Sequence, residues 1–231
     1  MLPPYLQAVL GHDALGTGVR LLPLMGGLLV ASRPAPQVVA HFGARAAASA
    51  GLVVLAFAGL LGSRTTADSG YGFVALWLTV TGLGFGLSLI PAMNGGLSAL
   101  PRDHAGSGSG LLMTMRQVGG AIGIGLLGSL LADTFRDRLD VTGLPARAAD
   151  TAGESVVAAH LAAERASPER AAELAASANS AYVHGMGVAL LVCGIAALVS
   201  ALLAAAFLPG TPDAREPETP DMAVEGADAR Q

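Results

Sequence analysis

Several residue types are scarce or missing in this chain of 231 residues. It has no lysine, one cysteine (Cys193) and one tryptophan, and only 13% of its residues are charged. A single cysteine excludes a disulfide scaffold, and low charge combined with 52% apolar residues excludes an intrinsically disordered chain. The formal net charge is -4, so the chain lacks the basic field that nucleic-acid binding needs, and we expect no nucleic-acid partner.

Charge is also missing from long stretches of the chain. Uncharged runs cover 18 residues at Ala46–Ser63, 33 at Ser69–Pro101 and 39 at Leu174–Pro212. A helix needs about 20 mostly apolar residues to cross the roughly 30 Å hydrocarbon core of a bilayer. The sequence therefore predicts an all-α, polytopic transmembrane helix bundle surrounded by membrane lipid. The five expected spans are Gly16–Val39, Ala46–Leu61, Tyr71–Leu97, Gly106–Leu131 and Tyr182–Leu208.

The spans divide the chain into five regions. Residues 1–11 are expected to be the end of a truncated transmembrane helix, and residues 12–133 to hold four transmembrane helices. Residues 134–181 form an Ala-rich loop outside the bilayer, where Ser167-Pro168-Glu169 is typical of a helix start and predicts short surface helices. Residues 182–208 form the last span. The acidic, proline-containing residues 209–231 are expected to be a disordered tail.

No arrangement typical of an enzyme, a metal site or a cofactor site is visible. None of the five histidines has a metal-ligand spacing to another ligand. The stretch from Gly123 to Gly128 matches the dinucleotide motif GxGxxG, but it lies inside an apolar helix with no strand before it. Small residues four apart instead favour close helix packing in lipid. The residues expected to pack this way in the third and fourth spans are Gly82, Gly86, Gly119, Gly123 and Gly125.

Arg116 is the most informative single residue, because it lies about ten residues into the fourth span. A charge at mid-depth costs roughly 3 kcal/mol or more unless it finds a partner or water. Two interpretations stay open: a pathway or gating residue, and a structural arginine bonded to backbone carbonyls. Gln117 beside it and Asn94 in the third span are further candidates for the substrate pathway. Met113 could form a soft pocket wall.

Five short motifs in a fixed order resemble a known family. They are Tyr5–Gly11, Leu21–Pro23, Phe42–Arg45, Ala105–Leu112 and Arg116–Gly123. In this order they resemble the C-terminal half of the major facilitator superfamily, and more narrowly the drug:proton antiporters with fourteen transmembrane segments (EmrB/QacA type). The resemblance implies two pseudo-symmetric helix bundles around a central cavity. It also implies proton-driven efflux of drugs or other small amphipathic substrates across a bacterial cell membrane.

The resemblance assigns two further roles and leaves one alternative. Phe42, Gly43 and Arg45 would belong to the cytoplasmic loop motif, although Ala40 stands where the family has an acid. With this orientation, residues 134–181 would be an extracytoplasmic loop and the tail at residues 209–231 would be cytoplasmic. The partner would be an N-terminal transporter half, from the same gene or a separate chain. No Asp or Glu lies inside the five expected spans, so a proton-coupling carboxylate would lie elsewhere. The alternative is a non-transporting membrane subunit, or an inactive gene fragment, that scaffolds or regulates a partner.

Overall fold

Helices make up most of the part of the chain that the structure describes. A computed structural model describes residues 2–98 and 105–208, apart from the side chains of residues 90, 94–98 and 105–107. No strand occurs among these residues. The helices are α1 (Leu2–Pro4), the π-helix η1 (Tyr5–Val9), α2 (Ala14–Arg20), α3 (Leu22–Ser32), α4 (Ala35–Gly62), α5 (Tyr71–Ser98), α6 (Ala105–Arg138), α7 (Ala146–Ala152), α8 (Val156–Ala163) and α9 (Pro168–Phe207).

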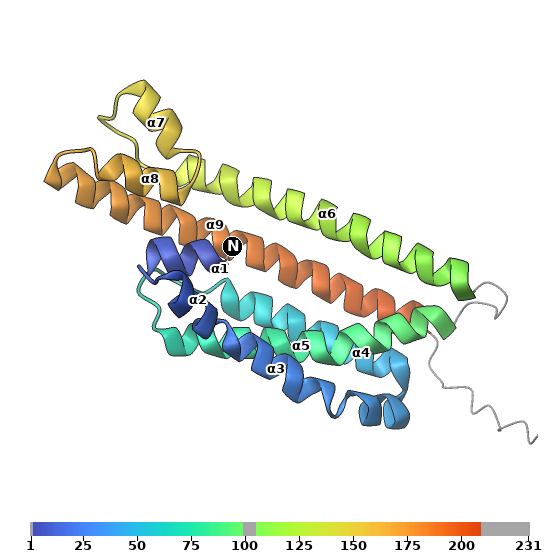
Figure 1. The fold of residues 1–231 in the computed structure, drawn as a ribbon. Helices are drawn as coiled ribbons and strands as arrows, with labels where there is room; N and C mark the ends of the chain where they lie inside the picture. Colours follow the sequence, from blue (N-terminus) through green and yellow to red (C-terminus); the bar gives the residue numbers. More distant parts are fainter. Residues whose placement is uncertain (1, 99–104, 209–231) are drawn as a thin grey trace, which may run out of the picture.

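The long helices lie roughly along one direction, with α9 between the others (Figure 1). Helix α5 packs against both α3 and α4, and α4 packs in turn against α9. Helix α6 lies on the other side of α9, and the short helices α7 and α8 cover the end where α6 stops and α9 starts. The elements therefore form a bundle of α3, α4, α5 and α9, with α6 attached to it through α9.

Five described helical segments are long and apolar enough to cross a membrane. They are Ala14–Ser32, Ala35–Gly62, Tyr71–Met93, Gly108–Arg138 and Pro168–Phe207. Their apolar side chains cover much of the outer surface, and several are more than half exposed, such as Phe57, Ile124 and Leu202. Exposed side chains of this kind are suited to lipid rather than to water.

The first expected span is divided differently in the structure. Helix α2 ends at Arg20 and α3 ends at Ser32, so Val38 and Val39 belong to the start of α4 and not to the first span. Arg33 and Pro34 form the turn between the two helices although both keep helical backbone angles. Pro34 has no N–H to donate to the carbonyl four residues before it, so the helical hydrogen bonding is interrupted there. Helix α4 then starts with Pro36 in its first turn, a position where the missing amide costs nothing.

The last expected span is the end of a much longer helix. Helix α9 runs for 40 residues from Pro168, so Tyr182 is not a helix boundary. Its length is about 60 Å at 1.5 Å per residue, twice the hydrocarbon thickness. The helix continues because residues 169–182 contain no proline or glycine and many alanines. The expected N-cap region at Ser167 therefore starts α9 itself rather than a separate surface helix.

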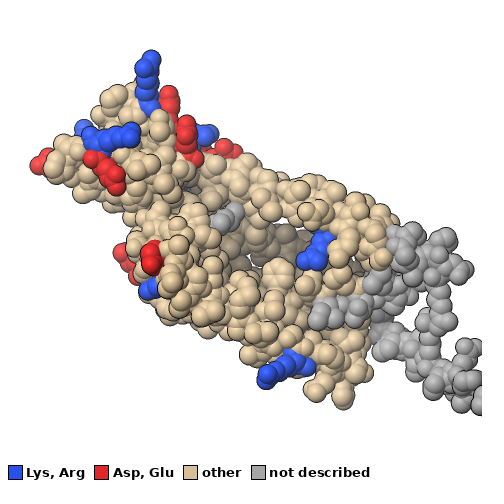
Figure 2. Space-filling model, in the orientation of Figure 1, with Lys and Arg blue, Asp and Glu red and all other residues tan. Residues whose placement is uncertain are grey.

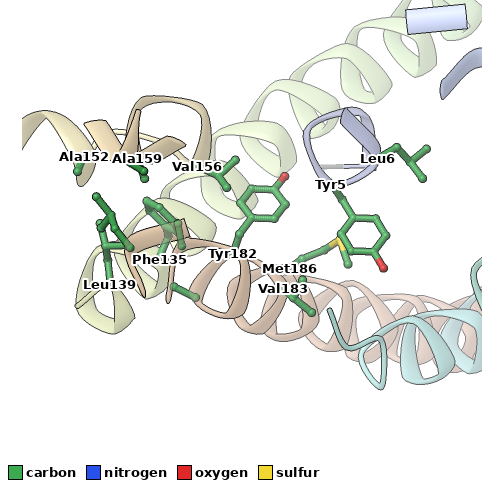
Figure 3. Packing of buried hydrophobic residues seen from close by; sticks show 14 of the residues in the cluster. Tyr5, Leu6, Phe135, Leu139, Ala152, Val156, Ala159, Tyr182, Val183 and Met186 are labelled. Atoms are coloured by element: carbon green, nitrogen blue, oxygen red, sulfur yellow. The ribbon is translucent and has the colours of Figure 1, made fainter. Parts of the chain in front are cut away.

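A buried cluster joins the N-terminal segment to the long helices (Figure 3). Tyr5 of η1 and Met186 of α9 are both fully buried in it. Phe135 of α6 meets the ring of Tyr182 edge-on, with centroids 6.5 Å apart and planes at 70°, and Val156 of α8 is buried in the same cluster. This cluster fixes α8 and the end of α6 on α9.

Candidate functional site

Helix α6 presents an open face that carries the predicted pathway residues. Every residue from Met113 to Ile122 is exposed, including Arg116 and Gln117. The part of the chain that the structure describes offers the Arg116 side chain no hydrogen-bond or ion-pair partner. Met113 lies one turn before Arg116 and Gln117, so the three side chains share one side of the helix. The structure thus brings these three predicted residues together on a surface that no other described element covers.

Asn94 cannot be related to that face. Its backbone lies in the last turns of α5, three residues after Pro91, but its side chain is outside the described residues. Pro91 is buried and lies inside the helix, which continues to Ser98. The proposed place of Asn94 on the pathway is therefore still a prediction.

The predicted loop motif lies at a sharp kink in α4. Gly43 has φ 81° and ψ 161°, a backbone conformation that splits the helix into an upstream and a downstream segment and is essentially restricted to glycine. Phe42 is 71% exposed and Arg45 is exposed on the other side of the kink. The kink itself was not predicted. Its signal was the glycine between two helical segments, which we interpreted only as part of a motif.

The predicted packing glycines fall into two groups. Gly82 and Gly86 of α5 face α3, where an added Cβ would collide with the Leu24 carbonyl at Gly82 and lie 2.7 Å from the Ala31 Cβ at Gly86. Gly119, Gly123 and Gly125 of α6 have open space around them, with no described atom within 4 Å of an added Cβ. A packing role for these three would need a partner outside the described chain.

Sequence reasoning missed two close approaches of α4, one to α9 and one to α5. A Cβ added at Gly59 would lie 2.8 Å from the Cα of Gly194 and 2.8 Å from the Leu190 carbonyl oxygen. A Cβ added at Gly51 would similarly lie 2.6 Å from the Ser88 amide nitrogen of α5. The available signal was the pair Gly51 and Gly59, eight residues apart, which places them about 80° apart around the helix. Gly51 can therefore face α5 while Gly59 faces α9.

An apolar cavity of about 430 Å³ lies between α3, α4, α5 and α9. Its walls are almost entirely aliphatic and aromatic, and they include Trp77, Phe85 and Cys193. The Trp77 indole N–H is buried without a hydrogen-bond partner in the described part of the chain. The cavity could hold an apolar group, with Trp77 as a single donor for an acceptor atom.

The comparisons with known proteins identify the family of this chain. No protein-family model matches it. It is 35% identical over 225 residues to the tetracenomycin C resistance and export protein of Streptomyces glaucescens, covering 93% of this chain and 41% of that protein. It is 32% identical over 127 residues to an uncharacterised MFS-type transporter of Bacillus subtilis, covering 55% of this chain and 24% of the relative. The chain belongs to the major facilitator superfamily.

Membership in the major facilitator superfamily confirms several of the predictions made from sequence. A multidrug resistance protein B homolog of Mycobacterium tuberculosis is also 30% identical over 213 residues, covering 90% of this chain and 38% of that relative. The superfamily consists of transport proteins and not of enzymes. With five helices of membrane-spanning length, the chain is a multi-pass protein of the cell membrane. It spans less than half the length of these relatives.

Proposed function

We propose that this chain is the C-terminal half of a carrier that exports small amphipathic compounds, of the fourteen-span drug:proton antiporter type. The order of the five sequence motifs supports this assignment. The chain covers 41% of a relative named for tetracenomycin C resistance and export and 38% of one named for multidrug resistance. These shares agree with one half of a longer transporter.

The observation that carries the proposal is the open face of α6. Arg116 lies about 12 Å along the helix from Gly108, the first residue of the apolar segment, at 1.5 Å per residue. A charged side chain at such a depth costs roughly 3 kcal/mol or more in lipid unless water or a partner meets it. We infer that this face lines an aqueous cavity closed on its other side by the N-terminal half. Arg116 and Gln117 would then contact the substrate or gate its path.

The apolar walls around this region suit substrates with a large hydrophobic part. Met113 and Met115 on α6 are exposed beside Arg116, and Met side chains adapt to varied ligand shapes. No carboxylate occupies the interior of the expected spans, so the group that binds the coupling proton would belong to the N-terminal half. Phe42, Gly43 and Arg45 would form the cytoplasmic loop motif of this half.

The test is drug tolerance in a host lacking its own efflux pumps, with this chain co-expressed with an N-terminal half from a relative. We expect tolerance to a hydrophobic cationic drug only when both halves are present. Arg116→Ala should abolish that tolerance with unchanged amounts of protein in the membrane. Arg64→Ala, in the loop after α4, is the matched control and should keep it. Full tolerance with Arg116→Ala would contradict the proposed role of Arg116.

The alternative, a non-transporting subunit that scaffolds or regulates a partner, rests on the short coverage of the relatives. It predicts a stable complex on purification in detergent with no change in drug tolerance when the chain is deleted. Loss of tolerance on deletion, restored by the wild-type chain and not by Arg116→Ala, would separate the carrier from this alternative.

A further inference from the structure

A cavity of about 620 Å³ lies between α7, α8 and the start of α9, in the segment that the sequence predicts outside the bilayer. Three arginines line it, one from each side: Arg147 of α7, Arg165 of the turn after α8, and Arg170 of α9. Leu144, Pro145 and Leu161 supply apolar wall. No carboxylate is among its lining residues, all of which belong to the described segment 143–170. We call this cavity the arginine pocket.

The arginine pocket has a sign of charge opposite to that of its surroundings. Residues 134–181 hold seven acidic residues and five arginines, yet three of those arginines line this one cavity. Figure 2 shows basic and acidic side chains gathered at the end of the molecule formed by α7 and α8, while those on the body are few and scattered. A cleft lined by one sign of charge concentrates ions of the opposite sign.

Two of the three guanidinium groups have no partner among the described residues. Among the described residues the salt bridges are Arg136–Asp133 at 3.8 Å and Arg170–Glu173 at 3.9 Å. The guanidinium groups of Arg147 and Arg165 make neither an ion pair nor a hydrogen bond to any described residue. Their donors, in the planar geometry that matches carboxylate and phosphate, are therefore available for a ligand.

The third arginine is held in place by the loop before α7. The Arg170 Nη1 atom donates a hydrogen bond of 3.0 Å to the carbonyl of Thr142. The Thr142 amide donates to the Asp140 carboxylate at 2.9 Å, and the Asp140 amide donates to the Ser177 hydroxyl of α9 at 2.9 Å. Gly143 has φ 79°, and a Cβ there would meet the Arg170 guanidinium. The loop thus orients Arg170 at the pocket wall.

The expected position of the bilayer along α9 favours a soluble anion over a lipid headgroup as the ligand of the pocket. Arg170 precedes Tyr182, where the apolar part of α9 starts, by twelve residues, which is about 18 Å along the helix. The headgroup region extends only about 5–8 Å beyond the hydrocarbon on each side. We propose that the arginine pocket binds a soluble organic anion with two carboxylate or phosphate groups and a small apolar part. This site is separate from the proposed transport pathway and does not depend on it.

The test is calorimetric titration of the full chain in phosphatidylcholine nanodiscs with phthalate, an aromatic dicarboxylate, and with 4-carboxyphenyl phosphate, which carries one carboxylate and one phosphate. We expect at least one of the two probes to bind the wild-type chain. The double variant Arg147→Ala/Arg165→Ala should bind that probe at least tenfold more weakly. The matched control is Arg136→Ala/Arg138→Ala, which removes the same charge from the end of α6 and should bind like the wild type.

Three results would overturn the proposal. The first is no binding of either probe to the wild-type chain. The second is an equal loss in both double variants, which would mean general charge attraction rather than a site. The third is loss of probe binding in nanodiscs that contain phosphatidylglycerol. This result would mean that a lipid headgroup occupies the pocket, so that the natural ligand is not a soluble anion. Monodisperse elution of each variant on gel filtration confirms that the arginine substitutions leave the fold intact.

Discussion

Single glycines decide how closely the helices approach in this bundle. At Gly59 the α4 backbone lies against Gly194 and Leu190 of α9, whereas Gly119 of α6 has open space around it. The two glycines share a residue type and an apolar helical context, so sequence alone does not distinguish them. Their difference depends on which helices cross, and that is a property of the whole bundle.

This contrast gives a prediction at Gly59. We expect Gly59→Ala to lower the melting temperature of the purified chain in detergent, because the methyl group would force α4 and α9 apart at a cost of about 1–3 kcal/mol. Gly119→Ala is the matched control. It should leave the melting temperature unchanged or slightly raised, since alanine is the better helix former. Equal melting temperatures for the two variants would show that α4 and α9 do not cross at Gly59.

At the scale of the element, composition predicted the helices well and their ends less well. The apolar runs located all five membrane-length helices, because bilayer thickness leaves a clear signal in sequence. The predicted ends differ from the observed ones where a helix continues beyond its apolar run. Helix α9 passes Tyr182 without a break, and α6 continues to Arg138. A change from apolar to polar residues marks where a helix leaves the bilayer and not where it ends. The kink at Gly43 has no hydropathy signal at all.

The continuity of α9 can be tested with proline. Ala176 is exposed inside the part of α9 that lies before the apolar segment. Ala176→Pro should break the helix there, at about 3 kcal/mol. Arg165 and Arg170 are already exposed, so the expected result is faster cleavage by trypsin after them, because local unfolding lets their backbone enter the protease. Limited proteolysis followed by mass spectrometry measures this.

The matched control for that experiment is Ala146→Pro at the first position of α7, where proline is tolerated. The preceding residue, Pro145, already has φ -57° and ψ 144°, a conformation compatible with a following proline. The control should be cleaved like the wild type. If Ala176→Pro is also cleaved like the wild type, α9 does not hold this end of the chain together.

At the scale of the whole molecule, the sequence indicated which residues matter but not what they face. Arg116 was identified by its depth in an apolar run, and the structure gives it an exposed place on α6. The sequence and the structure of this chain do not include the surface that would face Arg116 across the open side of α6. The arginine pocket was missed for a related reason: Arg147, Arg165 and Arg170 are spread over a loop that looks like an ordinary solvated surface until the fold gathers them.

A prediction for the whole molecule concerns which surfaces are accessible to water and which face lipid. In a Cys193→Ser background, with the N-terminal half present, we expect Met113→Cys on α6 to react with a membrane-impermeant maleimide. Leu202→Cys on α9, 65% exposed in this chain, should face lipid and remain unlabelled. Mass spectrometry of intact protein gives both yields. Equal labelling at the two sites would contradict an aqueous cavity along α6.

The close glycine crossings also bear on how this protein can change over generations. Every amino acid other than glycine carries a Cβ, so any missense change in those codons adds an atom where there is no room. The scaffold of α3, α4, α5 and α9 is therefore expected to be fixed by purifying selection at these positions. The open face of α6 has no such constraint on size. If α6 lines the proposed transport pathway, new substrate specificities can arise there by point mutation while the supporting helices stay the same.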